Sequence, residues 1–245
     1  MKEQIKKRFD LASHSYEQVA SIQKKCAYQL VSMLRMYYND YQITSILDVG
    51  TGTGYIPAIL QKQWSASQYT LNDLSEAMLN VVQEKFKNNP SFSFRLGDIE
   101  TLPIDSYQLI ISNLSIQWVD NIEKLIQKLY AKSNLLAFSC LTEGTFKQWG
   151  ELLSDYNIAN VVKKYPSVQE FTHAINILQP KRQNVITKDF TLTFSNPLQL
   201  MRYLKKLGAT YTSNVTDVAA LHKFAKYTEH KCILEYKVMF VLLER

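Results

Sequence analysis

The residues of this chain that are best placed to do chemistry form a glycine-rich turn that contains one acidic residue. An apolar, β-branched run over 46–49 predicts a strand, and a helical pattern begins near Tyr55. A strand that turns sharply into a helix around glycines brings bare amides and a helix N-terminus close to a ligand. The spacing is G-x-G-x-G, not the G-x-G-x-x-G of dinucleotide folds, so it predicts either a nucleotide-like ligand or a plain tight turn. The residues of interest are Asp48, Gly50, Thr51, Gly52 and Gly54.

Two further acids stand where later strands are expected to end. Asp73 lies 19 residues after Gly54, a spacing that suits a carboxylate for the two hydroxyls of a ribose. Asp98 can accept a hydrogen bond from the exocyclic amine of adenine, beside the apolar Ile99. Each aspartate alone has a turn explanation, but all of them in register with the glycines favour a nucleoside ligand.

The elements that must position these residues alternate between short apolar strands and amphipathic helices. This alternation predicts an α/β protein with a doubly wound, Rossmann-like, mostly parallel seven-stranded sheet, N-terminal helices and a helical lid insertion. Ser75 and Asp120 are the expected helix caps. The expected strands span 43–49, 68–71, 91–96, 107–112, 135–140, 185–194 and 232–243. The expected helices lie within 1–40 and at 55–64, 76–87, 121–131, 145–160, 167–178, 197–207 and 216–227.

No linker or internal repeat divides the 245 residues, which predicts one domain over 1–245. We expect N-terminal helices over 1–42, a ligand-binding core over 43–143, and lid insertions with closing strands over 144–245. No apolar run reaches the roughly 20 residues of a membrane helix. Three widely spaced cysteines and the lack of a secretory signal favour reduced thiols in the cytoplasm.

The net charge of +6 is unevenly distributed. Residues 44–143 hold 7 Lys/Arg and 10 Asp/Glu, a balance of −3, whereas residues 144–206 hold 9 and 4, a balance of +5. This pattern fits a basic rim that attracts an acidic partner, or a plain solvated surface rich in lysine. Nucleic acid is the rival partner for a basic chain, but no nucleic-acid-binding module is recognisable.

Three motifs in the first half of the chain resemble those of class I S-adenosylmethionine-dependent methyltransferases. They are Leu47–Gly54, Asn72–Ser75 and Gly97–Pro103. The resemblance implies that S-adenosyl-L-methionine is the cofactor, with Asp73 on its ribose and Asp98 on its adenine amine. The residues that would bind this cofactor are Asp48, Gly50, Thr51, Gly52, Gly54, Asp73, Leu74, Asp98, Ile99 and Asn113.

Further stretches extend the resemblance to the malonyl-acyl-carrier-protein O-methyltransferases of biotin synthesis. They are Ser112–Asp120, Arg8–Gln23, Thr142–Phe146, Met201–Thr210 and the ending Glu244–Arg245. This family methylates the free carboxyl group of malonyl-acyl carrier protein, or malonyl-CoA, and the ester primes pimeloyl chain synthesis. Quinone-pathway and arginine-modifying assembly proteins share parts of these stretches. A methyltransferase for another small carboxylate or a quinone precursor, and a non-methylating assembly or binding protein, therefore stay open.

Two positions depart from the family pattern. Gln108 stands where an aspartate is usual before the fourth strand, a change that could loosen a contact near the cofactor. Residues 131–134 lack the usual Pro-Gly-Gly, which predicts a shorter and tighter turn before the fifth strand.

The acceptor chemistry narrows the search for catalytic residues. A carboxylate is already nucleophilic at neutral pH, so alignment and exclusion of water should matter more than a general base. The four histidines show no metal-binding spacing, and we expect no metal. Arg202 is the first candidate to hold the malonyl carboxylate, unless it only braces its helix. Tyr16, Gln117 and Trp118 are expected to line the acceptor pocket, although Trp118 could simply pack.

The expected macromolecular partner is an acidic acyl carrier protein that carries malonyl-phosphopantetheine, with no nucleic acid and no membrane. Its approach would be steered by basic residues outside the core. The candidates are Lys147, Lys163, Lys164, Lys181, Arg182 and Lys206.

Overall fold

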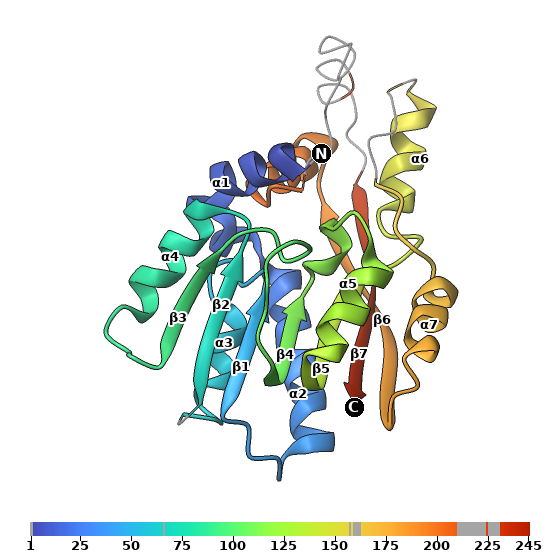
Figure 1. The fold of residues 1–245 in the computed structure, drawn as a ribbon. Helices are drawn as coiled ribbons and strands as arrows, with labels where there is room; N and C mark the ends of the chain where they lie inside the picture. The colour runs from blue at the N-terminus through green and yellow to red at the C-terminus, as the bar shows by residue number, and fades with distance from the viewer. Residues whose placement is uncertain (1, 66, 157, 159–162, 210–223, 225–230) are drawn as a thin grey trace.

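A seven-stranded mixed sheet forms the centre of the molecule (Figure 1). The computed structural model describes residues 2–65, 67–156, 158, 163–209, 224 and 231–245. The strands are β1 (Ser45–Val49), β2 (Gln68–Asp73), β3 (Phe92–Leu96), β4 (Tyr107–Asn113), β5 (Ser133–Leu141), β6 (Arg182–Phe194) and β7 (Cys232–Glu244). Their order is β3-β2-β1-β4-β5-β7-β6. β1 to β5 pair in parallel, and β7 runs antiparallel to both β5 and β6, so the predicted mostly parallel sheet is confirmed.

Helices cover both faces of the sheet. One face packs against α2, α3 and α4, and the other against α5 and α7. Figure 1 shows α5 and α7 on the near side, with α2 and α3 behind the strands. The helices are α1 (Lys2–Val19), α2 (Ser21–Tyr38), α3 (Tyr55–Leu60), α4 (Glu76–Phe86), α5 (Ile122–Ala131), α6 (Lys147–Asp155), α7 (Val168–Ile177) and α8 (Pro197–Lys206), with a 3₁₀ turn, η1 (Ile116–Trp118).

The central strands are apolar throughout because both of their faces are buried. In β4, Leu109 and Ile111 join the core beside α2, whereas Ile110 between them joins the core beside α5. Successive side chains of a strand point to opposite faces, so an unbroken apolar run fills two cores at once. This two-sided burial explains why the strands could be predicted from the sequence.

Of the two helix caps predicted from the sequence, one is confirmed and one is wrong. Ser75 caps α4 as predicted, and its Oγ accepts a hydrogen bond from the Met78 amide at 3.1 Å. The cap of α5 is Asn121 and not Asp120, because Asn121 directly precedes the first helical residue and accepts from the Lys124 amide at 2.9 Å. Asp120 lies instead 3.5 Å from the Lys2 ammonium.

The structure also tests the predicted turn before β5, the position of Gln108 and the ends of two helices. The turn before β5 is tight as expected, with Lys132 alone between α5 and β5. Gln108 does not lie near the carboxyl ends of the strands: it is the second residue of β4, at the amino edge of the sheet, where its side chain accepts from the Thr44 hydroxyl at 3.1 Å. Helix α3 ends at Leu60, before the predicted Trp64. Helix α6 ends at Asp155, before the predicted residue 160. The helix expected over 216–227 lies outside the described residues except for Phe224.

Helix α1 lies across the carboxyl edge of the parallel strands (Figure 1). It packs against α4 and against α8, which belongs to the segment that connects β6 and β7. Because β1, β2 and β4 all end beneath α1, this helix covers the residues at these strand ends. The fold therefore places the glycine-rich turn in an enclosed position.

Candidate active site

A cavity opens at the carboxyl edge of the sheet, under α1. It encloses about 1100 Å³, counting the space at its open mouth. A second, smaller hollow of about 430 Å³ shares five lining residues with it: Tyr16, Gln23, Gly50, Gly52 and Asn113. Of the predicted site residues, the larger cavity is lined by Tyr16, Gly50, Gly52, Asp73, Leu74, Asp98, Ile99, Asn113, Gln117 and Trp118. The predicted set thus converges from distant parts of the chain on one space.

Asp73 is fixed at the end of β2 by backbone amides. Its carboxylate accepts hydrogen bonds from the amides of Gly52 and Ser75, both at 2.8 Å. Burial raises the pKa of Asp73 to about 6, while these amides oppose the shift. Each carboxylate oxygen keeps further acceptor capacity, so Asp73 can still receive two hydroxyl groups of a ribose.

The three glycines of the turn all have positive φ angles, but for different physical needs. At Gly50 (φ +66°), a Cβ atom would lie 1.9 Å from the Ser115 Oγ, so the chain must pass close to η1 there. At Gly54 (φ +76°), a Cβ atom would lie 2.3 Å from Val82 of α4. Gly52 (φ +55°) faces open space. Gly54 lines neither hollow, so the structure places it in helix packing, whereas Gly50 and Gly52 face the cavity.

Asp48 and Thr51 line the smaller hollow instead of the main cavity. Asp48 is 1% exposed, and among the described residues neither of its carboxylate oxygens has a hydrogen-bond partner of normal geometry. Burial raises its pKa to about 7, with the Thr51 hydroxyl opposing the shift. A buried carboxylate with open acceptor positions beside a cavity is suited to a cationic group.

Sequence reasoning missed the partner of Asp98. The Lys2 ammonium, from the first turn of α1, pairs with both Asp98 and Glu100 at the edge of the cavity. The Asp98 Oδ1 also accepts from the Glu100 amide at 3.0 Å. Leu74 and Ile99 supply apolar walls nearby. No local pattern could have linked residues 2 and 98, because only the crossing of α1 over the sheet joins them.

Tyr16, Gln117 and Trp118 are further lining residues of the cavity. The Trp118 ring packs edge-on against Phe9 at a centroid distance of 5.6 Å. The Lys163 ammonium stands 5.1 Å from the centre of the Trp118 ring and donates to the Gln117 carbonyl. Burial lowers the pKa of Lys163. This lysine therefore braces η1 and does not extend into solvent at a basic rim.

Other cations are not where the sequence suggested. Arg202 is exposed on α8 and is not among the residues that line either hollow. Lys181 and Arg182 lie at the opposite edge of the sheet, where both reach the carboxylate of Glu244. The reason is that β6 begins where the antiparallel β7 ends, at the amino edge of the parallel strands.

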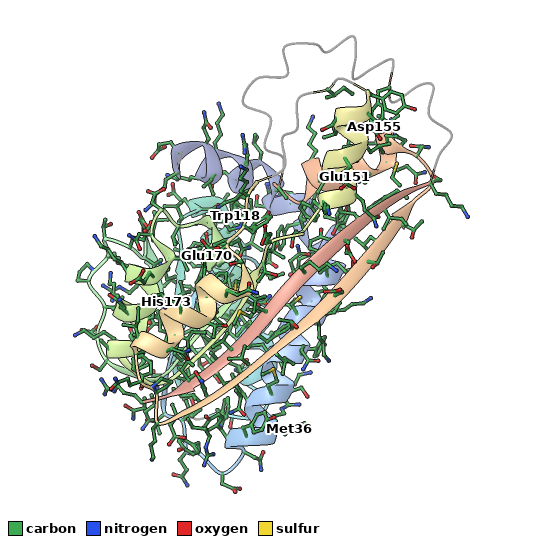
Figure 2. All side chains as sticks on the ribbon, turned by 90° about the vertical axis from the view of Figure 1, so that its right-hand side faces the viewer. Met36, Trp118, Glu151, Asp155, Glu170 and His173 are labelled. Atoms are coloured by element: carbon green, nitrogen blue, oxygen red, sulfur yellow. The ribbon has the colours of Figure 1, made fainter. Side chains whose placement is uncertain are left out.

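Several aromatic residues of the cavity wall were not predicted. They are Phe9, Phe146, Tyr165 and Tyr236. Phe146 and Leu114 both line the cavity and both have positive φ angles, +62° and +48°. Non-glycine residues in this region carry strain that tends to gather at functional sites. The described histidines are elsewhere: His14 is exposed on α1, and His173 projects from the outer face of α7 (Figure 2).

Comparison with known proteins gives the class of this fold and site. A family model described as "Methyltransferase domain" matches residues 46–132. The fold resembles phosphoethanolamine N-methyltransferase 2 of Haemonchus contortus, whose structure was solved with S-adenosyl-L-methionine. The TM-score is 0.61 at 14% identity, covering 96% of this chain and 57% of that one. The family model and the shared fold give the class of this chain, a methyltransferase domain.

Full-length relatives narrow the class. A malonyl-[acyl-carrier protein] O-methyltransferase of Neorickettsia risticii is 30% identical over 237 residues, which cover 97% of this chain and 94% of the relative. The enzyme of the same description from Bacillus cytotoxicus is 32% identical over 222 residues, covering 86% and 78%. The chain belongs to the malonyl-[acyl-carrier protein] O-methyltransferase family.

Proposed function

We propose that this protein methylates the free carboxyl group of malonyl-acyl carrier protein and releases the methyl ester that primes pimeloyl chain synthesis for biotin. The observation that carries the proposal is the end-to-end similarity to the Neorickettsia risticii enzyme, at 30% identity over 97% of the chain. Relatives of the same description match over most of their length, so a quinone precursor or a purely structural role is not favoured.

Three acids and an apolar wall would hold the cofactor in the cavity. Asp73 would receive the ribose hydroxyls, Asp98 the adenine amine, and Asp48 the ammonium group. The bound cofactor supplies a methyl group on a positively charged sulfur, and the C–S electron pair stays with sulfur when a carboxylate oxygen takes the methyl group. No proton moves in this transfer, so the protein needs no general base.

The protein would contribute to the reaction by aligning the acceptor carboxylate with the methyl group and by excluding water from the cavity. Tyr16, Gln117 and Trp118 line the cavity, and the acceptor would enter beside them. Gln117 is 2% exposed, and its side-chain amide donates to the Leu114 carbonyl at 2.7 Å, so η1 is a fixed wall. A fixed wall holds reacting atoms close to the geometry of attack. The predicted role of Arg202 in holding the carboxylate stays a prediction.

The exposed face of α8 is the proposed docking surface for the carrier protein. Arg202, Lys205 and Lys206 are exposed there, and Lys164 is exposed beside the Trp118 end of the cavity. Cations on a surface near a cavity mouth steer an acidic partner and make association sensitive to salt. The cytoplasm is the proposed compartment, because Cys26 and Cys140 are buried, reduced thiols.

The test is a methyl-transfer assay with purified protein, labelled S-adenosylmethionine and malonyl-acyl carrier protein. We expect a labelled methyl ester that base hydrolysis releases as methanol, and none with acetyl-acyl carrier protein, which has no free carboxyl group. Cofactor binding is measured in parallel by calorimetry. A protein that binds the cofactor but makes no ester would refute the proposed acceptor.

A further inference from the structure

Among the described residues, aromatic side chains form much of the cavity wall. Tyr16, Phe146, Tyr165 and Tyr236 line it from four separate segments. Among the described residues, the two lysines that line the cavity are Lys2 and Lys6, on the first turns of α1. Lys6 precedes Tyr16 by ten residues, roughly 15 Å along a helix. A carboxylate beside Tyr16 would therefore lie far from both of these lysines.

Tyr236 is the most firmly held of these phenols. It lies on β7 just beyond the residue that pairs with the end of β5, and it is 1% exposed. Its hydroxyl is 2.9 Å from the hydroxyl of Tyr203 on α8, and either oxygen can be the donor. Its ring packs edge-on against Phe146 at a centroid distance of 4.7 Å. Tyr236 is thus positioned from three sides.

The surroundings keep the Tyr236 hydroxyl protonated. Burial raises its pKa well above the ordinary value, and the neighbouring phenols Tyr203, Tyr165 and Tyr16 add to the shift. When Tyr203 donates to the Tyr236 oxygen, the Tyr236 proton becomes available to a ligand. Hydrogen bonds in such a chain strengthen one another.

We propose that the Tyr236 hydroxyl, oriented by Tyr203, donates a hydrogen bond to the carboxylate of the methyl acceptor. The inference rests on the proposed function, because it assigns the group that holds the malonyl anion. Tyr236 is then a catalytic residue that touches the substrate, and Tyr203 is a positioning residue. A hydrogen bond to one carboxylate oxygen leaves the other oxygen to attack the methyl group.

Charge also favours a phenol over a cation at this position. A carboxylate buried without a partner loses its hydration, and hydroxyl donors compensate for part of that loss. A guanidinium group there would stand close to the positively charged sulfur, and the two like charges would repel each other strongly in a poorly hydrated site. Neutral phenols hold the anion without that repulsion, which agrees with the position of Arg202 outside the cavity.

The experiment compares Tyr236→Phe with the wild type in the methyl-transfer assay. A hydrogen bond to a charged group gives an expected rise in KM for malonyl-acyl carrier protein of about ten- to hundredfold, with a smaller fall in kcat. Inhibition by the methyl ester product should hardly change, since the ester has no anionic oxygen. Cofactor affinity should also stay at its wild-type value. Tyr203→Phe should raise the same KM by a smaller factor.

Tyr130→Phe is the matched control, because Tyr130 is a buried tyrosine whose hydroxyl donates to the Glu244 carbonyl at the opposite edge of the sheet. It should leave the KM unchanged. A wild-type KM in Tyr236→Phe, or equal losses of affinity for the acid and the ester, would overturn the proposal. If Tyr236→Phe does not fold, an unchanged ratio of acid to ester affinity in Tyr203→Phe overturns it instead. A wild-type protein that makes no ester would refute the proposed function, which is a different result.

Discussion

At the scale of single residues, the site contains buried carboxylates whose burial does not favour folding. Asp48 and Asp73 are both buried, and burial raises the pKa of both groups. Asp73 has two amide donors, whereas Asp48 has no partner of normal geometry in the described part of the chain. A buried charge that lacks partners costs stability, and a cationic ligand would remove that cost.

The pH dependence of stability tests this reading of Asp48. Its pKa rises from 3.8 in the unfolded chain to about 7 in the folded protein, so folding disfavours the ionised form. Lowering the pH through 7 protonates the folded state first and raises its stability. We expect Asp48→Asn to increase the free energy of unfolding without cofactor by about 2 kcal/mol more at pH 8 than at pH 5.5.

Urea unfolding of both proteins at the two pH values measures this difference. Asp105→Asn is the control, because the Asp105 side chain is 89% exposed, and it should show no such pH dependence. An Asp48→Asn protein that gains the same stability at both pH values would contradict the assigned pKa.

At the scale of elements, the glycine-rich turn does two separate jobs. Gly50 and Gly52 keep the backbone bare beside the cavity, whereas Gly54 allows α3 to begin against α4. The same positive φ therefore serves ligand access at one end of the turn and helix packing at the other.

Alanine substitutions separate these two jobs. In Gly54→Ala, the new Cβ atom meets Val82 at 2.3 Å on a backbone with φ +76°, so strain and overpacking add. We expect a loss of about 2–5 kcal/mol in the free energy of unfolding. In Gly52→Ala, only the strained φ remains, and the expected loss is about 1–2 kcal/mol. Thermal unfolding without cofactor distinguishes them, and a Gly52→Ala protein that is the less stable of the two would disprove the assignment.

At the scale of the whole molecule, charge is divided between two edges of the sheet. Lys181 and Arg182 are engaged with Glu244 at the amino edge, far from the cavity, and α8 carries exposed cations on the other side. The basic excess of residues 144–206 is therefore not one patch. Only the cations near the cavity can affect the approach of a partner to it.

Charge reversal on α8 tests the docking surface. We expect the double variant Lys205→Glu and Lys206→Glu to raise the KM for malonyl-acyl carrier protein about tenfold, because like charges repel the acidic partner. The KM for malonyl-CoA should change much less. Lys132→Glu, at the exposed turn before β5, is the control and should change neither value. An equal effect of the double variant on both acceptors would argue against docking on α8.

A large part of the fold could be predicted because its signals are local. The apolar runs of the central strands, the Ser75 cap and the glycine spacing each depend on a few neighbouring residues. The acids Asp73 and Asp98 could be assigned to a site because parallel strands end at one edge of a sheet. The sequence could therefore predict that these acids share one cavity, and Tyr16, Gln117 and Trp118 line the same cavity.

The acceptor end was decided by tertiary structure. Tyr236 faces the cavity because β7 pairs antiparallel to β5 in one register, and a shift of one residue would turn its side chain to the other face. Lys2 reaches Asp98 only because α1 crosses the sheet, and Arg202 points outward because α8 buries its apolar face. The sequence by itself determined which chemistry the strand ends offer. Long-range packing decided which other side chains lie beside the strand ends, since register and helix orientation depend on contacts between segments far apart in the chain.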